Sequence, residues 1–268
     1  MQLDEIKSKL IRHTSCDKCG SSDANALYED GSQWCFSCET YSHPDKERNS
    51  VVIQQQPRQT QMLSIGITEA LSERGISEDT CRTYGVTIQN NKQIYPYYDQ
   101  SGKHVANKVR HPDKNFHSEG QLPPAGLFGQ QLFQQSGKYI TITEGEIDAM
   151  SAYEMLGSRW AVVSIKNGAQ SAVKDVKAQF EYLNRFENIV LCFDADEHGQ
   201  KAANAVAQIF EPNKCRIMHL AMKDANEYLK ANQRELFTKA WWEAKPYTPA
   251  GIVNLKDFEG LYDKDNRE

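Results

Sequence analysis

Thr143-Glu144-Gly145-Glu146-Ile147-Asp148 connects a predicted strand at 139–143 with a predicted helix at 147–156. The same alternation continues after it, with strand patterns at 160–165, 189–193 and 216–220 and helical patterns at 173–186 and 201–210. Strands that alternate with helices form a parallel sheet with helices on its faces, and sites in such sheets lie at the carboxyl ends of the strands. The pattern therefore predicts an α/β fold with a site beside Glu144.

Acidic residues follow three of these strand patterns. Carboxylates gathered within a few ångströms repel one another, so such a cluster is tolerated mainly when a divalent cation binds it. Mg²⁺ takes hard oxygen ligands and keeps several waters, as phosphoryl transfer requires. We therefore predict a catalytic magnesium site built from Glu144, Asp194 and Asp196. For Asp148 and Glu146 taken singly, a solvated helix cap is the alternative.

One residue separates Asp194 from Asp196, so their side chains face the same way if the strand continues and diverge if the chain turns there. In either arrangement both are expected near Glu144 on a neighbouring strand end. Asp148 lies four residues after Glu144 and can face the same site from the first turn of the helix.

Four of the seven cysteines form two Cys-x-x-Cys pairs, Cys16 with Cys19 and Cys35 with Cys38, separated by fifteen residues. This spacing is typical of a zinc site, because the two intervening residues let a turn direct both thiolates at one ion. A four-thiolate site is closed, so the zinc is predicted to fold a small module and to do no chemistry. The other three cysteines stand alone in apolar surroundings, which favours metal binding in a reducing compartment over disulfides.

The segment Asp30-Gly31-Ser32-Gln33-Trp34 precedes the second cysteine pair. Asp30 and Gln33 can read base edges, and Trp34 can stack on unpaired bases. The alternative is structural, with Trp34 forming the core of a purely architectural zinc module.

The composition indicates a soluble, cytoplasmic protein. With 39% hydrophobic and 25% charged residues the chain can bury a core, and it contains neither a membrane-spanning run nor a signal peptide. The net charge of −5 argues against a chain that binds nucleic acid over its whole surface. Charge is instead segregated: residues 101–138 hold five Lys or Arg against two acids, and residues 139–199 hold ten acids against five bases.

We predict five regions along the chain. The polar, glutamine-rich stretch between the cysteines and residue 63 is interpreted as a flexible linker, with a long surface loop as the alternative. Two short helices at 64–85 and paired strands at 93–98 and 105–109 indicate a mixed α+β subdomain before the parallel sheet. The predicted regions are a β-rich zinc ribbon at 1–40, the flexible linker at 41–62, the α+β subdomain at 63–137, the catalytic α/β domain at 138–245 and a C-terminal linker segment at 246–268.

These features resemble the Toprim family, whose members share a Glu-Gly strand end and an Asp-x-Asp strand end. The order of motifs along nearly the whole chain is similar to the primase half of the bacteriophage bifunctional primase-helicases. The motifs that carry this resemblance are the four cysteines, Lys108-Val109-Arg110, Asp113-Lys114-Asn115-Phe116, Leu127-Phe128-Gly129, Thr143 to Asp148, Val163-Ser164 with Gly168-Ala169, and Lys223 to Glu227.

The resemblance implies a DNA primase that makes short RNA primers from ribonucleoside triphosphates on a single-stranded DNA template. It implies zinc as a structural metal and Mg²⁺, with Mn²⁺ as a substitute, as the catalytic one. It also implies a replicative helicase, fused or separate, and a DNA polymerase that takes over the primer as partners, and the cytoplasm of an infected host cell as the location. The residues implied as magnesium ligands are Glu144, Asp194, Asp196 and Asp224 with Asp148 in support, and those implied as nucleotide or template ligands are Lys108, Lys114 and Arg110, surface solvation being an equal account of Arg110.

The chain departs from the family pattern in two places. Ser164-Ile165-Lys166-Asn167-Gly168 lacks the small or glycine-rich middle expected of this turn, which leaves phosphate contact by Gly168 open. The sequence also contains no Gly-x-x-x-x-Gly-Lys-Ser/Thr phosphate loop, so a helicase motor of that kind is not expected within it. Both a fragment of a longer chain and a stand-alone primase fit.

A binding protein is the competing hypothesis. A recombination mediator with a zinc module and a Toprim domain would hold DNA without catalysis. A topoisomerase is disfavoured because nothing marks a nucleophilic tyrosine domain, and a nuclease would degrade the template. Synthesis of oligoribonucleotides on single-stranded DNA separates the enzyme from the alternatives.

Overall fold

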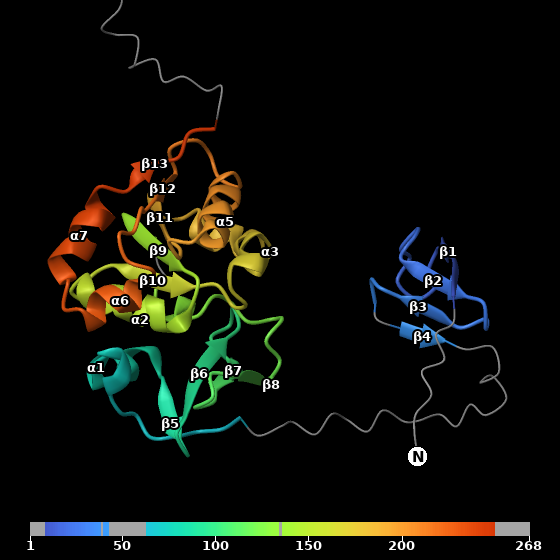
Figure 1. Ribbon diagram of the computed structural model, residues 1–268, viewed down its shortest axis with the longest axis horizontal. Helices are drawn as coiled ribbons and strands as arrows, with labels where there is room; N and C mark the ends of the chain where they lie inside the picture. The colour runs from blue at the N-terminus through green and yellow to red at the C-terminus, as the bar shows by residue number, and fades with distance from the viewer. Residues whose placement is uncertain (1–8, 39, 43–62, 134–135, 250–268) are drawn as a thin grey trace, which may run out of the picture. The chain divides into compact units, whose positions relative to one another are not determined.

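We analysed a computed structural model, which describes residues 9–38, 40–42, 63–133 and 136–249. The chain divides into two compact units, Met1–Thr60 and Gln61–Glu268 (Figure 1). The predicted linker begins later than expected, because β4 (Thr40–Ser42) carries the first sheet to residue 42. The rest of that linker, residues 43–62, lies outside the described residues.

The first unit contains a four-stranded antiparallel sheet in the order β1-β2-β3-β4. Its first three strands are β1 (Leu10–Thr14), β2 (Asn25–Tyr28) and β3 (Gln33–Cys35). Among the described residues of this unit, the buried apolar ones are Cys16, Ala26 and Cys35. So few buried contacts do not stabilise a fold of this size. A metal bound by the cysteines would supply the additional folding free energy. The predicted β-rich ribbon is confirmed.

The second unit begins with the predicted α+β subdomain. A single turn of 3₁₀ helix, η2 (Ser72–Arg74), precedes α1 (Glu78–Tyr84), where the predicted pair of short helices was placed. Ser77 begins α1 as expected, since its hydroxyl accepts a hydrogen bond from the Thr80 amide at 3.3 Å. An antiparallel sheet follows in chain order: β5 (Thr87–Gln89), β6 (Lys92–Tyr98), β7 (His104–Arg110) and β8 (Phe116–Gly120).

A five-stranded sheet in the order β10-β9-β11-β12-β13 forms the centre of the second unit. Its strands are β9 (Tyr139–Thr143), β10 (Ala161–Ser164), β11 (Asn188–Cys192), β12 (Cys215–Ile217) and β13 (Lys245–Pro246). The first four strands in that order are parallel, as predicted, and β13 is added antiparallel at the edge. The sheet therefore continues to Pro246, inside the segment predicted as a C-terminal linker. The sequence did not predict this strand, because so short a stretch carries no strand pattern of its own.

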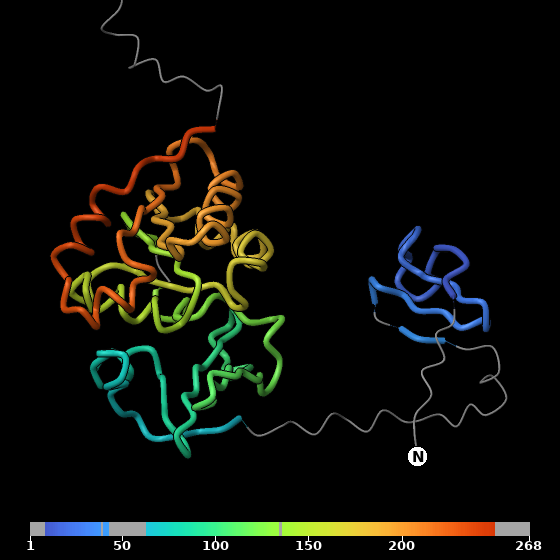
Figure 2. Tube along the Cα trace, viewed as in Figure 1, coloured from blue at the N-terminus to red at the C-terminus, as the bar shows by residue number. Residues whose placement is uncertain are grey.

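Helices cover both faces of this sheet, which explains why its strands are almost wholly apolar (Figure 1). One face carries α2 (Glu146–Met155), α6 (Ala225–Lys230) and α7 (Arg234–Trp242), which pack with Val162 and Val190 in one core cluster. The other carries α3 (Ala172–Ala178), α4 (Phe180–Leu183) and α5 (Glu197–Ala207), which pack with Ile140 and Leu191 in a second cluster. The Cα trace in Figure 2 follows the chain through the strands and helices of this unit.

Two helices differ from their predicted bounds. The helix predicted at 173–186 is broken at Gln179, whose φ of −116° ends α3 and starts α4. The helix predicted at 201–210 begins four residues earlier, at Glu197, because the Asp196 side chain caps it. The acidic segment 194–197 is therefore a tight turn into a helix.

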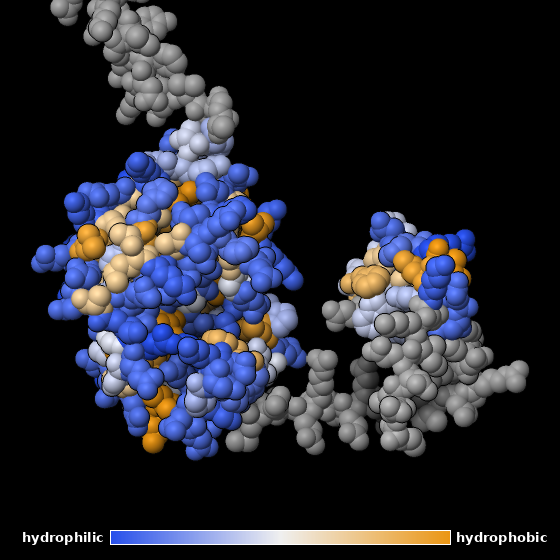
Figure 3. Space-filling model, in the orientation of Figure 1, coloured by the Kyte–Doolittle hydropathy of each residue, from blue (hydrophilic) through white to orange (hydrophobic). Residues whose placement is uncertain are grey.

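Apolar residues on the surface are scattered (Figure 3). In the first unit Leu10, Ile11, Phe36 and Tyr41 are between 45% and 60% exposed, a high density for so small a module. No helix in the described part of the chain combines the length and apolar character needed to cross a membrane.

Candidate active site and metal centre

Glu144 follows the last residue of β9 and contacts the strand beside it. Its Oε1 accepts a hydrogen bond from the backbone N–H of Asp194 at 3.0 Å. β9 and β11 are paired up to Thr143 and Cys192, so parallel pairing places the two acidic segments at one edge of the sheet. The sequence prediction that Glu144 and Asp194 lie together is met by this contact.

Asp196 and Asp224 each begin a helix. Asp196 Oδ1 accepts from the Gly199 amide at 2.8 Å, at the start of α5. Asp224 Oδ1 accepts from the Glu227 amide at 2.9 Å, at the start of α6. A carboxylate at a helix N-terminus is stabilised by the unpaired N–H groups and the helix dipole, which holds these negative charges at the site. The chain turns directly after β11, so that the Asp194 amide lies against Glu144 while the Asp196 side chain caps α5.

Asp148 lies on the first turn of α2, facing the N-terminus of α6. Its Oδ1 accepts from the Asn226 amide at 3.1 Å. Burial raises the pKa of Asp148 to about 8, and the charges of Asp224 and Asp194 add to this rise. Asp148 therefore lies close enough to other carboxylates for their charges to add to the effect of burial on its pKa.

The same repulsion acts on the other acids. Burial and the neighbouring Glu144 and Asp224 charges raise the pKa of Asp194 to about 6. The pKa of Glu144 is also raised, by burial and by the charge of Asp196, while the Asp194 amide opposes the rise. Lys223 is a nearby cation to which the sequence analysis assigned no role. Its Nζ lies 3.9 Å from Asp224 Oδ2, and its charge lowers the pKa values of Glu144 and Asp194.

These acids, Glu144, Asp148, Asp194, Asp196 and Asp224, are named the acidic edge. Their oxygens suit Mg²⁺, a hard cation that keeps waters between itself and some of its ligands. They are more widely spaced than the cysteines: in the described residues, only the four thiols form a group of three or more potential ligands whose atoms all lie within 4.8 Å. Such spacing fits an ion held by a few carboxylates together with substrate phosphates.

Gly199 lies beside the acidic edge and was not singled out by the sequence analysis. A Cβ at this position would lie 2.5 Å from Glu144 Oε1 and 2.4 Å from the Asp194 carbonyl oxygen. The absence of a side chain is therefore what lets α5 approach both acids. A glycine in the first turn of a helix is a sequence signal for such close approach, since glycine disfavours helices.

Lys108 lies on β7 and is held in a buried ion pair. Its Nζ is 2.8 Å from Glu146 Oε1, and it donates to the Lys166 carbonyl oxygen at 2.8 Å. Glu146 is 4% exposed and also accepts from the Tyr97 hydroxyl at 2.6 Å. Glu146 is therefore neither a solvated cap nor a member of the acidic edge. It fixes Lys108, which the family resemblance implied as a nucleotide ligand.

Arg110 and Lys114 line a surface cavity of about 560 Å³ together with Arg74 and His111. Lys114 is exposed and sits in a turn at φ 69°, where its amide donates to the His111 carbonyl at 3.0 Å. The Arg110 guanidinium lies 5.5 Å from the centroid of the Phe116 ring, so part of its surface is used by the fold. Glu69 and Glu73 line the same cavity, so its wall carries acids as well as the three basic residues.

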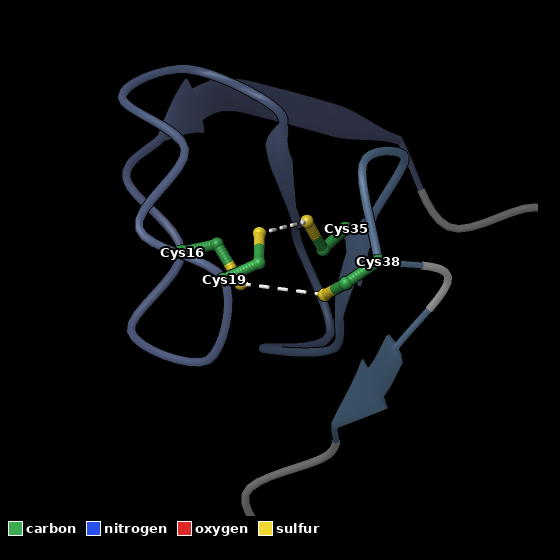
Figure 4. A group of neighbouring side chains, drawn as sticks. All are labelled: Cys16, Cys19, Cys35 and Cys38. Carbon is green, nitrogen blue, oxygen red and sulfur yellow. Dashed lines mark hydrogen bonds between the residues drawn. The ribbon is translucent and has the colours of Figure 1, made fainter. Parts of the chain in front are cut away.

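The four cysteines converge (Figure 4). The Sγ atoms of Cys16 and Cys38 are 3.7 Å apart, and those of Cys19 and Cys35 are 3.6 Å apart. Four thiolates at about 2.3 Å from one Zn²⁺ in a tetrahedron are separated by about 3.8 Å, so the arrangement fits zinc. The Thr40 hydroxyl is the largest cause that lowers the pKa of Cys38, to about 6, and backbone N–H groups lower the pKa of Cys16. The predicted zinc ligands are brought together.

The predicted base-reading strip is engaged in local contacts. Asp30 Oδ1 accepts from the Ser32 amide at 3.0 Å, and Gln33 Oε1 accepts from Asn25 Nδ2 at 2.8 Å. Trp34 is half-buried in β3, opposite Ala26. Phe36, which the sequence analysis did not single out, is 60% exposed and stacks on His13 at a centroid distance of 6.2 Å. An exposed aromatic directly after a metal-ligand cysteine is the signal that could have identified it.

Comparisons with known proteins agree with this geometry. A family model described as Toprim-like matches residues 141–229, and one described as the N-terminal α+β fold of the bacteriophage T7 DNA helicase/primase matches residues 66–120. A crystal structure of the primase fragment of the bacteriophage T7 primase-helicase protein is 36% identical, with a TM-score of 0.63, and the match covers 87% of this chain and 100% of that fragment. The chain belongs to the primase family of the T7-type phage primase-helicases.

This primase domain also matches longer proteins. A DNA helicase/primase of Enterobacteria phage T3 is 36% identical over 270 residues, which are 94% of this chain and 48% of the relative. The chloroplastic/mitochondrial Twinkle homolog protein of Arabidopsis thaliana is 29% identical over 192 residues, which are 62% of this chain and 26% of the relative. The chain thus spans half or less of the length of these curated relatives.

A second solved structure contains relatives of the primase domain in a complex. It contains bacteriophage T7 lagging-strand DNA polymerase interacting with primase domains of two subunits bound to an RNA/DNA hybrid and dTTP. Its matching chain is 37% identical, with a TM-score of 0.65, and the match covers 70% of this chain and 99% of that one.

Proposed function

We propose that this primase domain synthesises short RNA primers on single-stranded DNA, using the acidic edge to bind Mg²⁺ and the incoming ribonucleoside triphosphate. In this reaction a 3′-hydroxyl attacks the α-phosphate, and pyrophosphate leaves. The observation that carries the proposal is the gathering of carboxylates at one edge of the sheet, where Glu144 Oε1 accepts from the Asp194 amide at 3.0 Å. Burial, followed by the charges of neighbouring acids, raises the pKa of Asp148 and Asp194, as expected for such a group.

The acidic edge supports this chemistry through its charge. Mg²⁺ bound there would polarise the α-phosphate and stabilise the charge that develops as pyrophosphate leaves. Glu144 and Asp194 are the central ligands in this proposal, because a backbone hydrogen bond already fixes one against the other. Asp196 and Asp224 add negative charge from two helix N-termini, and Asp148 supports them from α2.

The triphosphate is held by basic residues on the antiparallel subdomain. Lys108 has a fixed ammonium directed by Glu146, which suits orientation of a phosphate. Lys114 is exposed in a turn and can follow a flexible polyphosphate. Arg110, whose surface Phe116 partly covers, serves the template backbone or solvent.

The zinc module reads the template in this proposal. Trp34 and the exposed Phe36 offer ring faces for unpaired bases, and Gln33 and Asp30 offer polar groups beside them. The zinc itself is structural, because four thiolates leave it no open position.

The partners follow from the relatives. The curated phage relative joins a primase to a helicase, and a solved relative contacts a DNA polymerase while bound to an RNA/DNA hybrid. We propose the same three partners for this chain: single-stranded DNA, a replicative helicase, fused or separate, and the DNA polymerase that extends the primer. Replication of phage DNA would place the protein in the cytoplasm of the infected cell. We also propose that Mn²⁺ can replace Mg²⁺ at the acidic edge.

The test is incorporation of labelled ribonucleotides by the whole chain on a panel of single-stranded templates with Mg²⁺. We expect short oligoribonucleotides on some templates and none with Asp194→Asn. Glu197→Gln is the matched control, because Glu197 is an exposed acid on the first turn of α5 that contacts Lys201 and no member of the acidic edge. Binding of single-stranded DNA without synthesis on any template would contradict the proposal and favour the recombination mediator.

A further inference from the structure

The loop that follows β10 departs from the family pattern at Lys166, and this lysine is 7% exposed. Its Nζ donates to the carbonyl oxygens of Ala125 at 2.9 Å and Pro123 at 3.5 Å. The Asp175 carboxylate on α3 lies 3.8 Å from Nζ, and its other oxygen accepts the Lys166 amide at 2.8 Å. Lys166 is therefore fixed at both its backbone and its side chain.

The same residue holds Lys108. The Lys166 carbonyl oxygen accepts a hydrogen bond from Lys108 Nζ at 2.8 Å, and Glu146 Oε1 lies 2.8 Å from the same nitrogen. An ammonium has three N–H groups, and these two oxygens account for two of them. The described part of the chain offers this nitrogen no third hydrogen-bond acceptor, and the centroid of the Phe116 ring lies 5.0 Å from it. The third N–H can therefore donate to a phosphate oxygen.

The loop also reaches the acidic edge. Ala169, three residues after Lys166, lies close enough to Glu144 for its backbone N–H to lower the pKa of that carboxyl. Lys166 thus contacts the candidate nucleotide lysine, and Ala169, three residues later, lies beside a candidate metal ligand. Whatever fixes this loop fixes the separation between them.

We propose that Lys166 and Asp175 form a positioning pair that sets the direction of the Lys108 ammonium relative to the acidic edge. This inference rests on the proposed function, in which Lys108 binds the nucleotide triphosphate. Lys166 is buried and acts through Lys108. The Lys166 ammonium holds the loop by a hydrogen bond to residues 123–125, which connect the antiparallel subdomain to the five-stranded sheet.

The burial of two opposite charges supports a positioning role over a stabilising one. Burial lowers the pKa of Lys166, and the Asp175 charge opposes that effect. A buried ion pair gives little net stability, because desolvation offsets the attraction, but it specifies one arrangement of the groups around it. A small residue at 166 would leave the carbonyls of Pro123 and Ala125 without this donor.

The experiment is a double-mutant cycle between Lys108→Met and Lys166→Met in the whole chain. Methionine keeps the apolar stem and the backbone carbonyl and removes the ammonium. We measure the dissociation constant for a non-hydrolysable ribonucleoside triphosphate with Mg²⁺, together with KM and kcat for primer synthesis. Lys174→Met is the matched control, since Lys174 is an exposed lysine beside Asp175 on α3.

Lys166→Met should weaken nucleotide binding by about three- to tenfold, the worth of one misdirected hydrogen bond, and raise KM with little change of kcat. In the Lys108→Met background the same change should have an effect below about twofold, because the group it positions is gone. Lys174→Met should bind as the unchanged chain does.

Additive effects in the cycle, or unchanged nucleotide affinity in a folded Lys166→Met variant, would overturn the inference. If Lys166→Met unfolds, Asp175→Asn replaces it in the cycle, since the amide keeps an acceptor for the Lys166 amide and removes the charge. Failure of the unchanged chain to synthesise RNA would refute the proposed function alone, because the binding cycle decides the positioning role without synthesis.

Discussion

Replacing Asp148 by asparagine should stabilise the protein in the absence of magnesium. Asparagine has nearly the same shape, and its oxygen can still accept the hydrogen bond from the Asn226 amide. The change removes a charge that burial and the carboxylates of Asp224 and Asp194 all disfavour. Few substitutions at a functional site raise stability, so the direction of the effect is diagnostic.

The magnitude follows from the pKa. A rise from the ordinary value of 3.8 to about 8 corresponds to at most about 6 kcal/mol of destabilisation by the ionised Asp148. Because the side chain is only partly buried, solvent screens part of this, and we expect about 2–3 kcal/mol.

The pH dependence fixes the sign. Below about pH 4 the carboxyl is protonated in both the folded and the unfolded chain, so this penalty is absent. As the pH rises from about 4 to about 8 the unfolded carboxyl ionises first, and the wild-type stability falls relative to the variant. Above about pH 8 the difference is constant.

The assay is urea unfolding of wild type and Asp148→Asn at pH 5.5, 7 and 8.5, without added Mg²⁺ and without a chelator, which would strip zinc. The advantage of the variant should grow with pH. Added Mg²⁺ should stabilise the wild type and have a smaller effect on the variant, because a ligand that binds only the folded state adds free energy according to its affinity. A variant that is no more stable than the wild type at pH 8.5 would refute the reasoning.

Three further predictions concern other parts of the molecule. Gly199→Ala should cost about 1–3 kcal/mol of stability and weaken Mg²⁺ affinity measured by calorimetry, because its Cβ would lie 2.5 Å from Glu144 Oε1; unchanged metal affinity would contradict this. Lys114→Ala should raise the nucleotide KM, while Lys103→Ala, another exposed lysine, should not; weaker DNA binding with unchanged nucleotide kinetics would reassign Lys114 to the template. Cys35→Ser and deletion of residues 1–62 should both abolish initiation on a template while extension of a supplied dinucleotide survives at least weakly, because the metal folds the first module; initiation at the same template sequences by the deleted chain would show that the zinc module is not the reader.

Much of the fold could be predicted where one segment carries its own pattern. The strand at Tyr139–Thr143 was placed at its observed bounds, because a buried parallel strand is a continuous apolar run. The zinc ligands followed from spacing alone, since a Cys-x-x-Cys turn fixes the direction of two thiolates. Glu144, Asp194 and Asp196 were proposed as site residues because they come just after apolar strands, whereas Asp224 was proposed from the family resemblance.

Contacts between distant segments could not be predicted. β13 is two residues long and exists only through its pairing with β12, so the sequence around Lys245 gave no periodic signal. Glu146 looked like its neighbour Glu144, yet it begins α2 after the extended Gly145, and its side chain contacts Lys108 and Tyr97. Lys166 was seen as a departure from a family pattern, and only the fold shows what it contacts.

Template-directed synthesis is the claim on which the account depends most. Its most direct test is to supply the whole chain with Mg²⁺, four ribonucleotides and a template on which it initiates, then to change one template base downstream of the start and sequence the products. The account predicts short RNAs whose base changes to the complement at that position, and no RNA from Asp194→Asn under the same conditions. Products that ignore the template base, or synthesis that persists in Asp194→Asn, would contradict it.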